Sequence, residues 1–183
     1  MIKLVPMTPE FLEALLEGRR EHAEALLDIE LPDEFPSRGE KGFLGLRLRQ
    51  MGEDERFQTW CPHAIVLGKQ MVGHAGYHGP PGVNSTQNPR AVEFGYRTFP
   101  PYRGRGIATQ AATMLMDIAR ERGIHQFVLS VAPDNEPSLA IVRKFGFVET
   151  GQHMDEVDGL ELVFELDSNP QVASSGSDPV EGG

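Results

Sequence analysis

The residues best suited to chemistry lie in one short segment, Pro101 to Thr109, which ends where a long stretch of helical periodicity begins. The free N–H groups at a helix start, and the partial positive charge there, favour anions. Glycine has no Cβ, so Gly104 and Gly106 let the backbone approach a phosphate closely. Arg103 and Arg105 add positive charge suited to phosphate. The segment predicts a pyrophosphate site held mainly by main-chain amides.

Other phosphate-binding motifs match this segment only in part. A nucleotide P-loop requires Gly-x-x-x-x-Gly-Lys-Ser/Thr, which the chain lacks, and a dinucleotide fingerprint requires a third glycine where Thr109 stands. A flexible, glycine-containing turn into a helix, with two solvent-exposed arginines, would explain the segment without any ligand. A nucleotide-binding protein using the same turn also stays open at this point.

The elements on either side of the segment must position it. Ala91 to Phe99 alternates as a strand, and Gly104 to about Arg122 has helical spacing and is closed by Gly123. An apolar strand follows at Gln126 to Val131. A strand–helix–strand unit of this kind predicts two parallel strands joined by a right-handed crossover. The alternation also predicts Glu93 on the opposite face of the first strand from Val92 and Phe94.

The rest of the chain supplies shorter elements around this unit. Before the unit, we expect a first strand at 2–5 and helices at 9–16 (capped by Thr8), 19–28 and about 43–51. A hairpin of 63–67 and 71–77 and a long loop at 79–90 should follow. After the unit, we expect a helix capped by Asp134 or Asn135 that runs through Phe145, and a closing hairpin of 147–151 and 160–166.

Three ordered motifs together resemble the GCN5-related N-acetyltransferase (GNAT) family. Arg103-x-x-Gly106-x-Ala108 matches the family's Arg/Gln-x-x-Gly-x-Gly/Ala signature, with Val92-Glu93-Phe94-Gly95-Tyr96 before it at the family's spacing. Asn135-x-x-Ser138-x-x-x-Val142-x-x-x-Gly146-Phe147 follows, and looks most like the branch of ribosomal-protein N-terminal acetyltransferases. The resemblance is specific over about residues 60–166. It implies an α/β fold with a mixed, mostly antiparallel central sheet, a parallel splayed pair and flanking helices.

The resemblance also implies a cosubstrate and a site. Acetyl-coenzyme A would donate the acetyl group, with its pyrophosphate on the glycine turn and its pantetheine along the 91–99 strand like an added strand. No metal is expected. The residues implied to bind the cofactor are Phe94, Gly95, Tyr96, Arg97, Arg103, Gly104, Arg105, Gly106, Ile107, Ala108, Thr109, Asn135 and Ser138.

The implied reaction is direct attack of an amine on the thioester in a ternary complex. The amine must first be neutral, so a base is needed. Glu93 is the candidate base, since carboxylates at this position serve that role in some relatives. It could equally be a charged residue that faces away from the core or that structures the site. Ser138 is the candidate hydrogen-bond partner of the sulfur. Many relatives carry a tyrosine acid where this chain has Val142, which shifts that role to Ser138 or to water.

The composition of the chain limits its possible partners, its cellular location and its domain organisation. The chain has 183 residues, 17 basic and 27 acidic, and a net charge of −10, which argues against a nucleic-acid binder. One cysteine and no apolar run of membrane length fit a cytoplasmic protein. We expect a single domain over 1–166 and a disordered acidic, Ser/Gly-rich tail over 167–183.

The acceptor is the least determined part. A protein N-terminus, an amino acid, a polyamine or an aminoglycoside all fit a primary-amine acceptor, and exposed strand edges are compatible with a homodimer. A non-catalytic acyl-CoA sensor or regulatory module is the alternative from another class. We expect Asp155, Glu156 and Asp158 near the acceptor, or simply as a solvated turn. His74 and His78, four residues apart on a strand, are interpreted as surface or pocket histidines.

Overall fold

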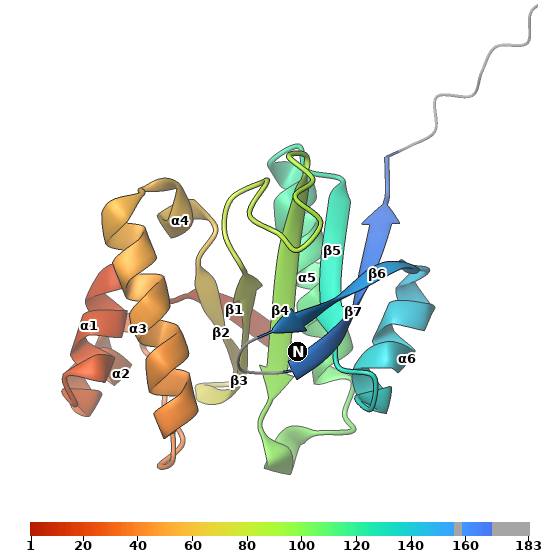
Figure 1. The fold of residues 1–183 in the computed structure, drawn as a ribbon. Helices are drawn as coiled ribbons and strands as arrows, with labels where there is room; N and C mark the ends of the chain where they lie inside the picture. Colours follow the sequence, from red (N-terminus) through yellow and green to blue (C-terminus); the bar gives the residue numbers. More distant parts are fainter. Residues whose placement is uncertain (156–158, 170–183) are drawn as a thin grey trace, which may run out of the picture.

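A computed structural model describes residues 1–155 and 159–169 of the chain. Its centre is a seven-stranded sheet in the order β1-β2-β3-β4-β5-β7-β6 (Figure 1). The strands are β1 (Ile2–Pro6), β2 (Pro62–Leu67), β3 (Gln70–Tyr77), β4 (Ala91–Thr98), β5 (Gln126–Val131), β6 (Val148–Asp155) and β7 (Gly159–Asp167). The helices are α1 (Pro9–Leu16), α2 (Arg20–Leu27), α3 (Arg38–Glu53), α4 (Arg56–Thr59), α5 (Ile107–Glu121) and α6 (Glu136–Phe145), with a 3₁₀ turn at Pro100–Tyr102.

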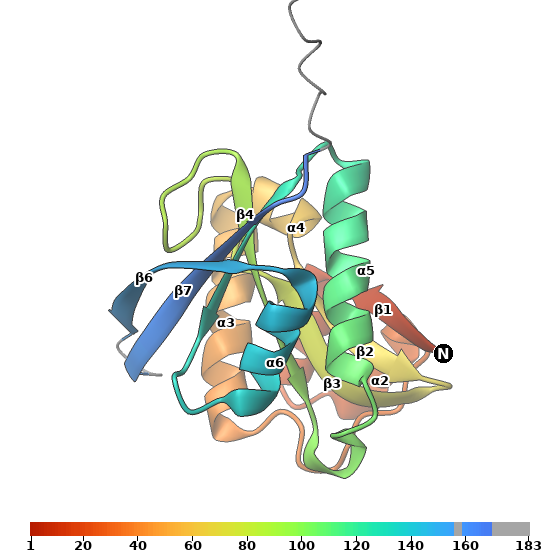
Figure 2. The ribbon, with the colours of Figure 1, turned by 90° about the vertical axis from the view of Figure 1, so that its right-hand side faces the viewer.

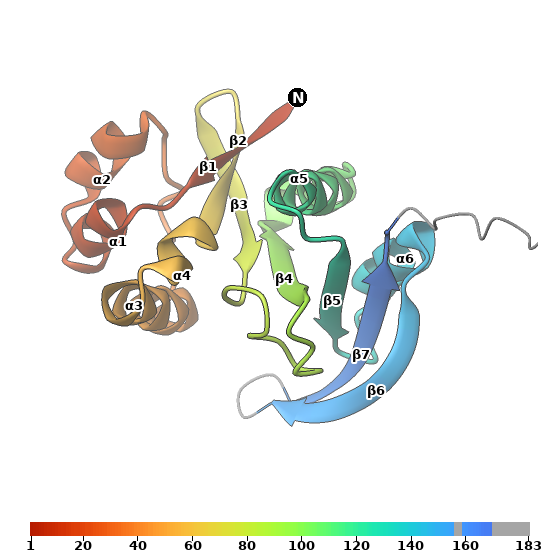
Figure 3. The same cartoon turned by 90° about the horizontal axis from the view of Figure 1, so that it is seen from above.

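Helices cover the sheet on both faces and form two separate cores. On one face α5 and α6 pack on the centre of the sheet, with Leu115, Phe94 and Phe127 in the middle of the larger core (Figure 2). On the other, α1, α2 and α3 pack over β2 and β3, around Phe11 and Leu44 (Figure 3). The mixed sheet flanked by helices confirms the fold expected from the sequence.

The parallel pair at the centre of the sheet separates after only a few residues. β4 and β5 pair from Ala91 with Gln126 to Glu93 with Val128, whereas β4 continues to Thr98 against β3 on its other side. Every other pair in the sheet is antiparallel. The sheet therefore opens between β4 and β5 beyond Glu93, and we call this opening the breach.

Local signals explain where the helices begin. Thr8 caps α1 as expected, with its hydroxyl accepting from the Phe11 N–H over 3.3 Å. The long helix α5 begins at Ile107 rather than at Gly104, because Gly104 and Gly106 have positive φ values of 73° and 71° and form the turn before it. α3 is longer than expected and begins in a capping box of Ser37 and Glu40.

The end of the domain is anchored slightly beyond the expected boundary. β7 continues through Asp167, which pairs with Gln126, and the Ser168 N–H donates to the His125 carbonyl over 2.9 Å. The expected tail from 170 onward lies outside the described residues, as do Glu156 and Asp158 of the acidic turn. Within the described part of the chain, no helix has the length and apolarity of a membrane span.

Candidate active site

A hollow of about 600 Å³ lies between the end of β4, the start of α5 and α6. Its walls bring together most of the predicted cofactor residues, from three segments that are distant in sequence. The predicted residues that line it are Tyr96, Arg97, Arg103, Gly104, Gly106, Ile107, Ala108, Thr109, Asn135 and Ser138. Lys144 lines it too. The hollow thus collects Arg97, Arg103 and Lys144 on a chain whose net charge is −10.

The glycine turn forms the part of this hollow that suits an anion. Gly106 is the N-cap of α5 and makes no side-chain cap, so the first N–H groups of the helix are not capped by that residue. A Cβ on Gly104 or Gly106 would meet no atom within 4 Å, which shows that the turn faces open space. Uncapped N–H groups beside open space are the geometry that binds phosphate groups.

Three predicted cofactor residues do not line this hollow. The Phe94 side chain is 1% exposed and lies in the core. Gly95 lines a different hollow, described below. Arg105 lies over the ring of Tyr102, with its guanidinium carbon 5.7 Å from the ring centroid. Phe94 and Gly95 can therefore meet a cofactor through the main chain at most.

Asn135 and Ser138 stand together at the start of α6. Asn135 is the N-cap, and its Oδ1 accepts the Ser138 N–H over 3.2 Å. Beside them, the Tyr96 hydroxyl is buried without a hydrogen-bond partner among the described residues. Burial raises the pKa of Tyr96, and the neighbouring Ser138 hydroxyl opposes that shift. At the tyrosine-acid position of many relatives, Val142 is 2% exposed and offers no donor.

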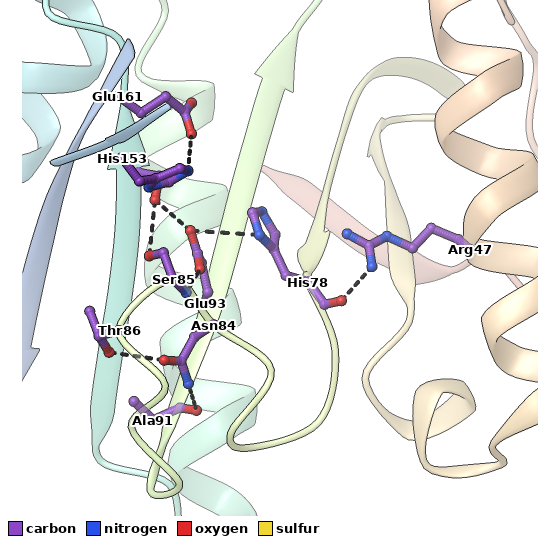
Figure 4. Close-up of polar contacts among 10 residues, drawn as sticks. Arg47, His78, Asn84, Ser85, Thr86, Ala91, Glu93, His153 and Glu161 are labelled. Atoms are coloured by element: carbon purple, nitrogen blue, oxygen red, sulfur yellow. Dashed lines mark hydrogen bonds and ion pairs between the residues drawn. The ribbon is translucent and has the colours of Figure 1, made fainter. Parts of the chain in front are cut away.

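Glu93 is not a solvated surface charge. It is 2% exposed and lies on the opposite face of β4 from the Phe94 core, as the alternation predicted. Its Oε1 accepts from the Ser130 hydroxyl and its Oε2 from the Ser85 N–H, both over 2.6 Å (Figure 4). His78 Nδ1 lies 3.6 Å from Oε1. The carboxylate therefore sits at the breach with both oxygens occupied.

The loop between β3 and β4 holds Ser85 over Glu93 and is organised by one amide, that of Asn84. Asn84 Nδ2 donates to the Ala91 carbonyl, and its Oδ1 accepts from the Thr86 hydroxyl (Figure 4). Asn84 Nδ2 also donates to the Asn88 carbonyl, and Oδ1 accepts from the Asn88 N–H. The Ser85 hydroxyl also lies 3.2 Å from that of Ser130. The loop is thus tied to β4 and to β5.

A second, smaller hollow of about 160 Å³ opens beside β3 and β4 near α3. It is lined by Phe43, Pro62, the β3 segment His74–Tyr77, His78, Gly95, Tyr96 and Arg97. Tyr96 and Arg97 border both hollows, so the two meet at the end of β4.

An ionised carboxylate lies behind this second hollow. Glu40 of α3 is 7% exposed, and its Oε1 lies 3.6 Å from His74 Nε2 and 3.9 Å from Arg97 Nε. The adjacent His74 ring lowers the pKa of Glu40 to about 2, against the effect of burial. Glu40 is therefore charged throughout the neutral range.

The lone cysteine takes no part in this arrangement. Cys61 is 5% exposed, and burial raises the pKa of its thiol to about 11, so the thiol is protonated at neutral pH. Among residues 1–155 and 159–169, no three His, Cys, Asp or Glu side chains are grouped as a metal site.

Sequence reasoning missed the partners of Glu93. Ser85, Ser130 and the contact from His78 come from a loop and two strands whose meeting no local pattern encodes. One signal was available for His78, since the β3–β4 hairpin register places it directly across from Glu93, and its N–H donates to the Glu93 carbonyl over 2.8 Å.

Comparison with known proteins decides the family. The family model described as an acetyltransferase (GNAT) domain matches residues 2–148. The chain belongs to the GNAT acetyltransferases. The match includes the glycine turn, both strands of the breach and α6, and it ends where β6 begins. This confirms the family indicated by the sequence motifs.

Individual relatives agree with this assignment. An uncharacterised N-acetyltransferase of Bacillus subtilis is 30% identical over 153 residues, which cover 81% of this chain and 94% of the relative. A ribosomal-protein-alanine N-acetyltransferase of Brucella melitensis has the same fold, with a TM-score of 0.58, 23% identity, and coverage of 91% and 99% of the two chains. An acetyltransferase of Salmonella typhimurium, solved with acetyl-CoA, has a TM-score of 0.60, 19% identity, and coverage of 94% and 96%. This GNAT chain is an acetyltransferase, and the comparisons do not favour the alternative of a non-catalytic sensor.

Proposed function

We propose that this GNAT acetyltransferase binds acetyl-CoA in the larger hollow and transfers the acetyl group directly to a primary amine held in the smaller one. The observation that carries the proposal is the meeting of three features: an uncapped glycine turn, a hollow of about 600 Å³ beside it, and the breach between β4 and β5. The turn suits a pyrophosphate and the breach suits an extended arm that must reach the far face of the sheet.

The main chain of β4 supports the placing of the pantetheine arm. The Glu93 carbonyl accepts from the N–H of His78, the residue that follows β3, so the odd-numbered residues of β4 bond towards β3 and the even-numbered ones face β5. Beyond Glu93, β5 no longer pairs with them. The carbonyl of Phe94 and the main chain of Tyr96 are then the groups that an amide-bearing arm would pair with.

The chemistry requires few protein groups, because a thioester is already activated. Glu93 is our candidate for the carboxylate that drives deprotonation of the amine, and Ser138, in the wall of the larger hollow, is our candidate to hydrogen-bond the departing sulfur. A main-chain N–H of β4 would stabilise the oxyanion. Direct transfer fits the protonated, buried state of Cys61, which leaves that thiol unsuited to carry an acyl group.

The acceptor class is a primary amine on a peptide N-terminus or on a small molecule. The solved relative from Brucella melitensis is named for acetylation of a ribosomal-protein alanine, which favours testing peptide N-termini first. The ionised Glu40 behind the smaller hollow supports an acceptor that arrives as a cation.

Cofactor binding is tested by a thermal-shift comparison of wild type, Ala140→Trp and Arg143→Trp. Ala140 is an exposed α6 residue in the wall of the larger hollow, so an indole there fills the hollow without backbone strain. Arg143, exposed on the same helix, does not line it and is the control. We expect acetyl-CoA and CoA, but not ATP, to stabilise wild type and Arg143→Trp, and neither to stabilise Ala140→Trp. No shift with CoA well above micromolar concentration contradicts the proposal.

A further inference from the structure

His78 lies beside Glu93 and beside the smaller hollow, in which we place the acceptor amine. Its ring follows β3 directly and stands on the same side of the sheet as Glu93, with Nδ1 3.6 Å from Glu93 Oε1 (Figure 4). On the other side of the ring, a methyl group on Gly95 would lie 3.6 Å from Nε2. Gly95 is two residues past Glu93, the last residue of β4 that pairs with β5, so Nε2 lies beside the breach.

Glu93 itself is poorly placed to take a proton from a substrate. It is 2% exposed, and each carboxylate oxygen already accepts a hydrogen bond of 2.6 Å. Glu93 also lines neither of the two hollows, so an amine bound in either one does not meet this carboxylate directly. The His78 side chain, in contrast, is 43% exposed and lines the smaller hollow.

We propose that His78 is the catalytic base of this acetyltransferase, and that Glu93 is the positioning carboxylate behind it. The inference rests on the proposed function and specifies how the acceptor loses its proton. With Nδ1 turned to the carboxylate, the neutral ring presents the Nε2 lone pair to the hollow.

The surroundings of His78 keep its ring neutral at physiological pH. Although 43% of the His78 side chain is exposed, the residues packed around the rest of the ring desolvate it and lower its pKa; Arg47 of α3 and His153 of β6 lower it further, and Glu93 of β4 and Asp155 of β6 oppose them. Arg47 is anchored at this place, because its Nη1 donates to the His78 carbonyl. A neutral imidazole is the form that accepts a proton.

The proton and electron balance is complete with these groups. One proton of the ammonium passes to His78 Nε2 and from its exposed edge to solvent. The amine nitrogen then forms its bond to the thioester carbon as the carbon–sulfur bond breaks. The second amine proton ends on the thiolate, which leaves as CoA–SH.

The test compares wild type with His78→Gln, Glu93→Gln and the control His22→Gln, an exposed histidine on α2. Acetyl transfer is followed as thiol release from pH 5 to 9, with Ala- and Ser-initiated tetrapeptides and spermidine as acceptors. We expect His78→Gln to lower kcat/KM about 10²- to 10⁴-fold and to abolish the acid limb of its pH profile. Binding of acetyl-CoA should change less than about twofold, and His22→Gln should match wild type.

Glu93→Gln separates the two roles. Glu93 raises the pKa of His78, so removing its charge should move the acid limb to lower pH while leaving a measurable rate. If Glu93 is instead the base, Glu93→Gln abolishes the acid limb and His78→Gln retains it, which overturns the inference.

A measurement without an acceptor keeps the inference testable if no amine is turned over. The His78 ring is titrated by NMR in the acetyl-CoA complexes of wild type and Glu93→Gln, with its signal assigned by loss in His78→Gln. We expect it to titrate below its ordinary range and lower still in Glu93→Gln. Titration in the ordinary range, unmoved by Glu93→Gln, overturns the inference. Failure to bind acetyl-CoA at all overturns the proposed function instead.

Discussion

Ser130, two residues beyond the last residue of β5 that pairs with β4, donates a hydrogen bond of 2.6 Å to Glu93, the last residue of β4 in that pairing. The contact fixes the Glu93 carboxylate at the point where the two strands separate. It also leaves the carboxylate turned towards His78, whose Nδ1 lies 3.6 Å from the same oxygen.

Replacing Ser130 with alanine should loosen this carboxylate without touching the cofactor hollow. We expect Ser130→Ala to lower kcat about 3- to 10-fold and the free energy of unfolding by about 1–2 kcal/mol, because a buried charge loses one partner. Steady-state kinetics and urea unfolding measure both, and the affinity for acetyl-CoA should not change. A variant with wild-type kcat would show that the contact has no part in catalysis.

Asn135 combines a structural and a ligand-facing role, and two substitutions separate them. Asn135→Ala removes the cap of α6 and should destabilise the domain by about 1 kcal/mol. Asn135→Asp keeps a capping oxygen but loses the side-chain amide donor of a residue that lines the larger hollow. We therefore expect near wild-type stability and weaker binding of acetyl-CoA for Asn135→Asp, measured by thermal unfolding and calorimetry. Unchanged affinity in both variants would confine Asn135 to the cap.

Ser138, at the start of α6, and Tyr96, near the end of β4, carry two hydroxyls beside the larger hollow, where we expect the sulfur. Ser138→Ala should lower kcat about 10-fold with little change in acetyl-CoA affinity, since the departing thiolate loses a hydrogen bond. Tyr96→Phe removes a buried hydroxyl that has the Ser138 side chain beside it but no other partner among the described residues, so the free energy of unfolding should change by less than about 1 kcal/mol. A larger destabilisation of Tyr96→Phe would mean that this hydroxyl is firmly hydrogen-bonded in solution.

The stability of the domain should fall on mild acidification because of His63. This side chain is 4% exposed, and burial lowers its pKa to about 4. The unfolded chain binds a proton near pH 6.5 and the folded one does not, so stability is lost as pH falls from about 6.5 to about 4, by up to about 1.4 kcal/mol per pH unit. Glu40, with a pKa of about 2, contributes its own loss only below about 4.5.

Urea unfolding between pH 7.5 and 4.5 isolates the His63 contribution. The slope of stability against pH should be smaller in His63→Leu than in wild type over that range. Equal slopes would show that His63 is protonated in the folded state or that other groups set the acid sensitivity.

The cofactor side of the molecule was largely predictable from the sequence, whereas the acceptor side was not. β4, the glycine turn, α5 and β5 follow one another along the chain. Their apolar periodicity and the glycines at their ends indicate which segments are strands and which is a helix, and this order makes the two strands parallel. The error at the start of α5 arose because Gly104 and Gly106 were counted as helix, although both adopt positive φ.

The partners of Glu93, in contrast, come from segments that are brought next to it only when the chain folds. Ser85 reaches it from an irregular loop, and Ser130 from a strand 37 residues away in sequence. The extent of α3 was also missed, although the Ser37-x-x-Glu40 capping box marked its start. Glycines within α3 weakened its helical pattern, whereas in the structure the helix packs against α1 and its Leu44 and Met51 are buried in the same core.

Because Asn84 organises the 79–90 loop, the residues that hold Ser85 over Glu93 are distinct from the residues on the outer side of the loop. Because that amide ties Asn88, Thr86 and Ala91 together, the position of Ser85 over Glu93 does not depend on the exposed side chains of Val83 and Gln87. Position 83 can therefore take other side chains while Ser85 keeps its contact with Glu93, whereas position 87, where Gln87 has a φ of 55°, favours glycine, asparagine or aspartate. Varying position 83 in a designed library tests whether this loop selects the acceptor while the Ser85–Glu93 contact is kept.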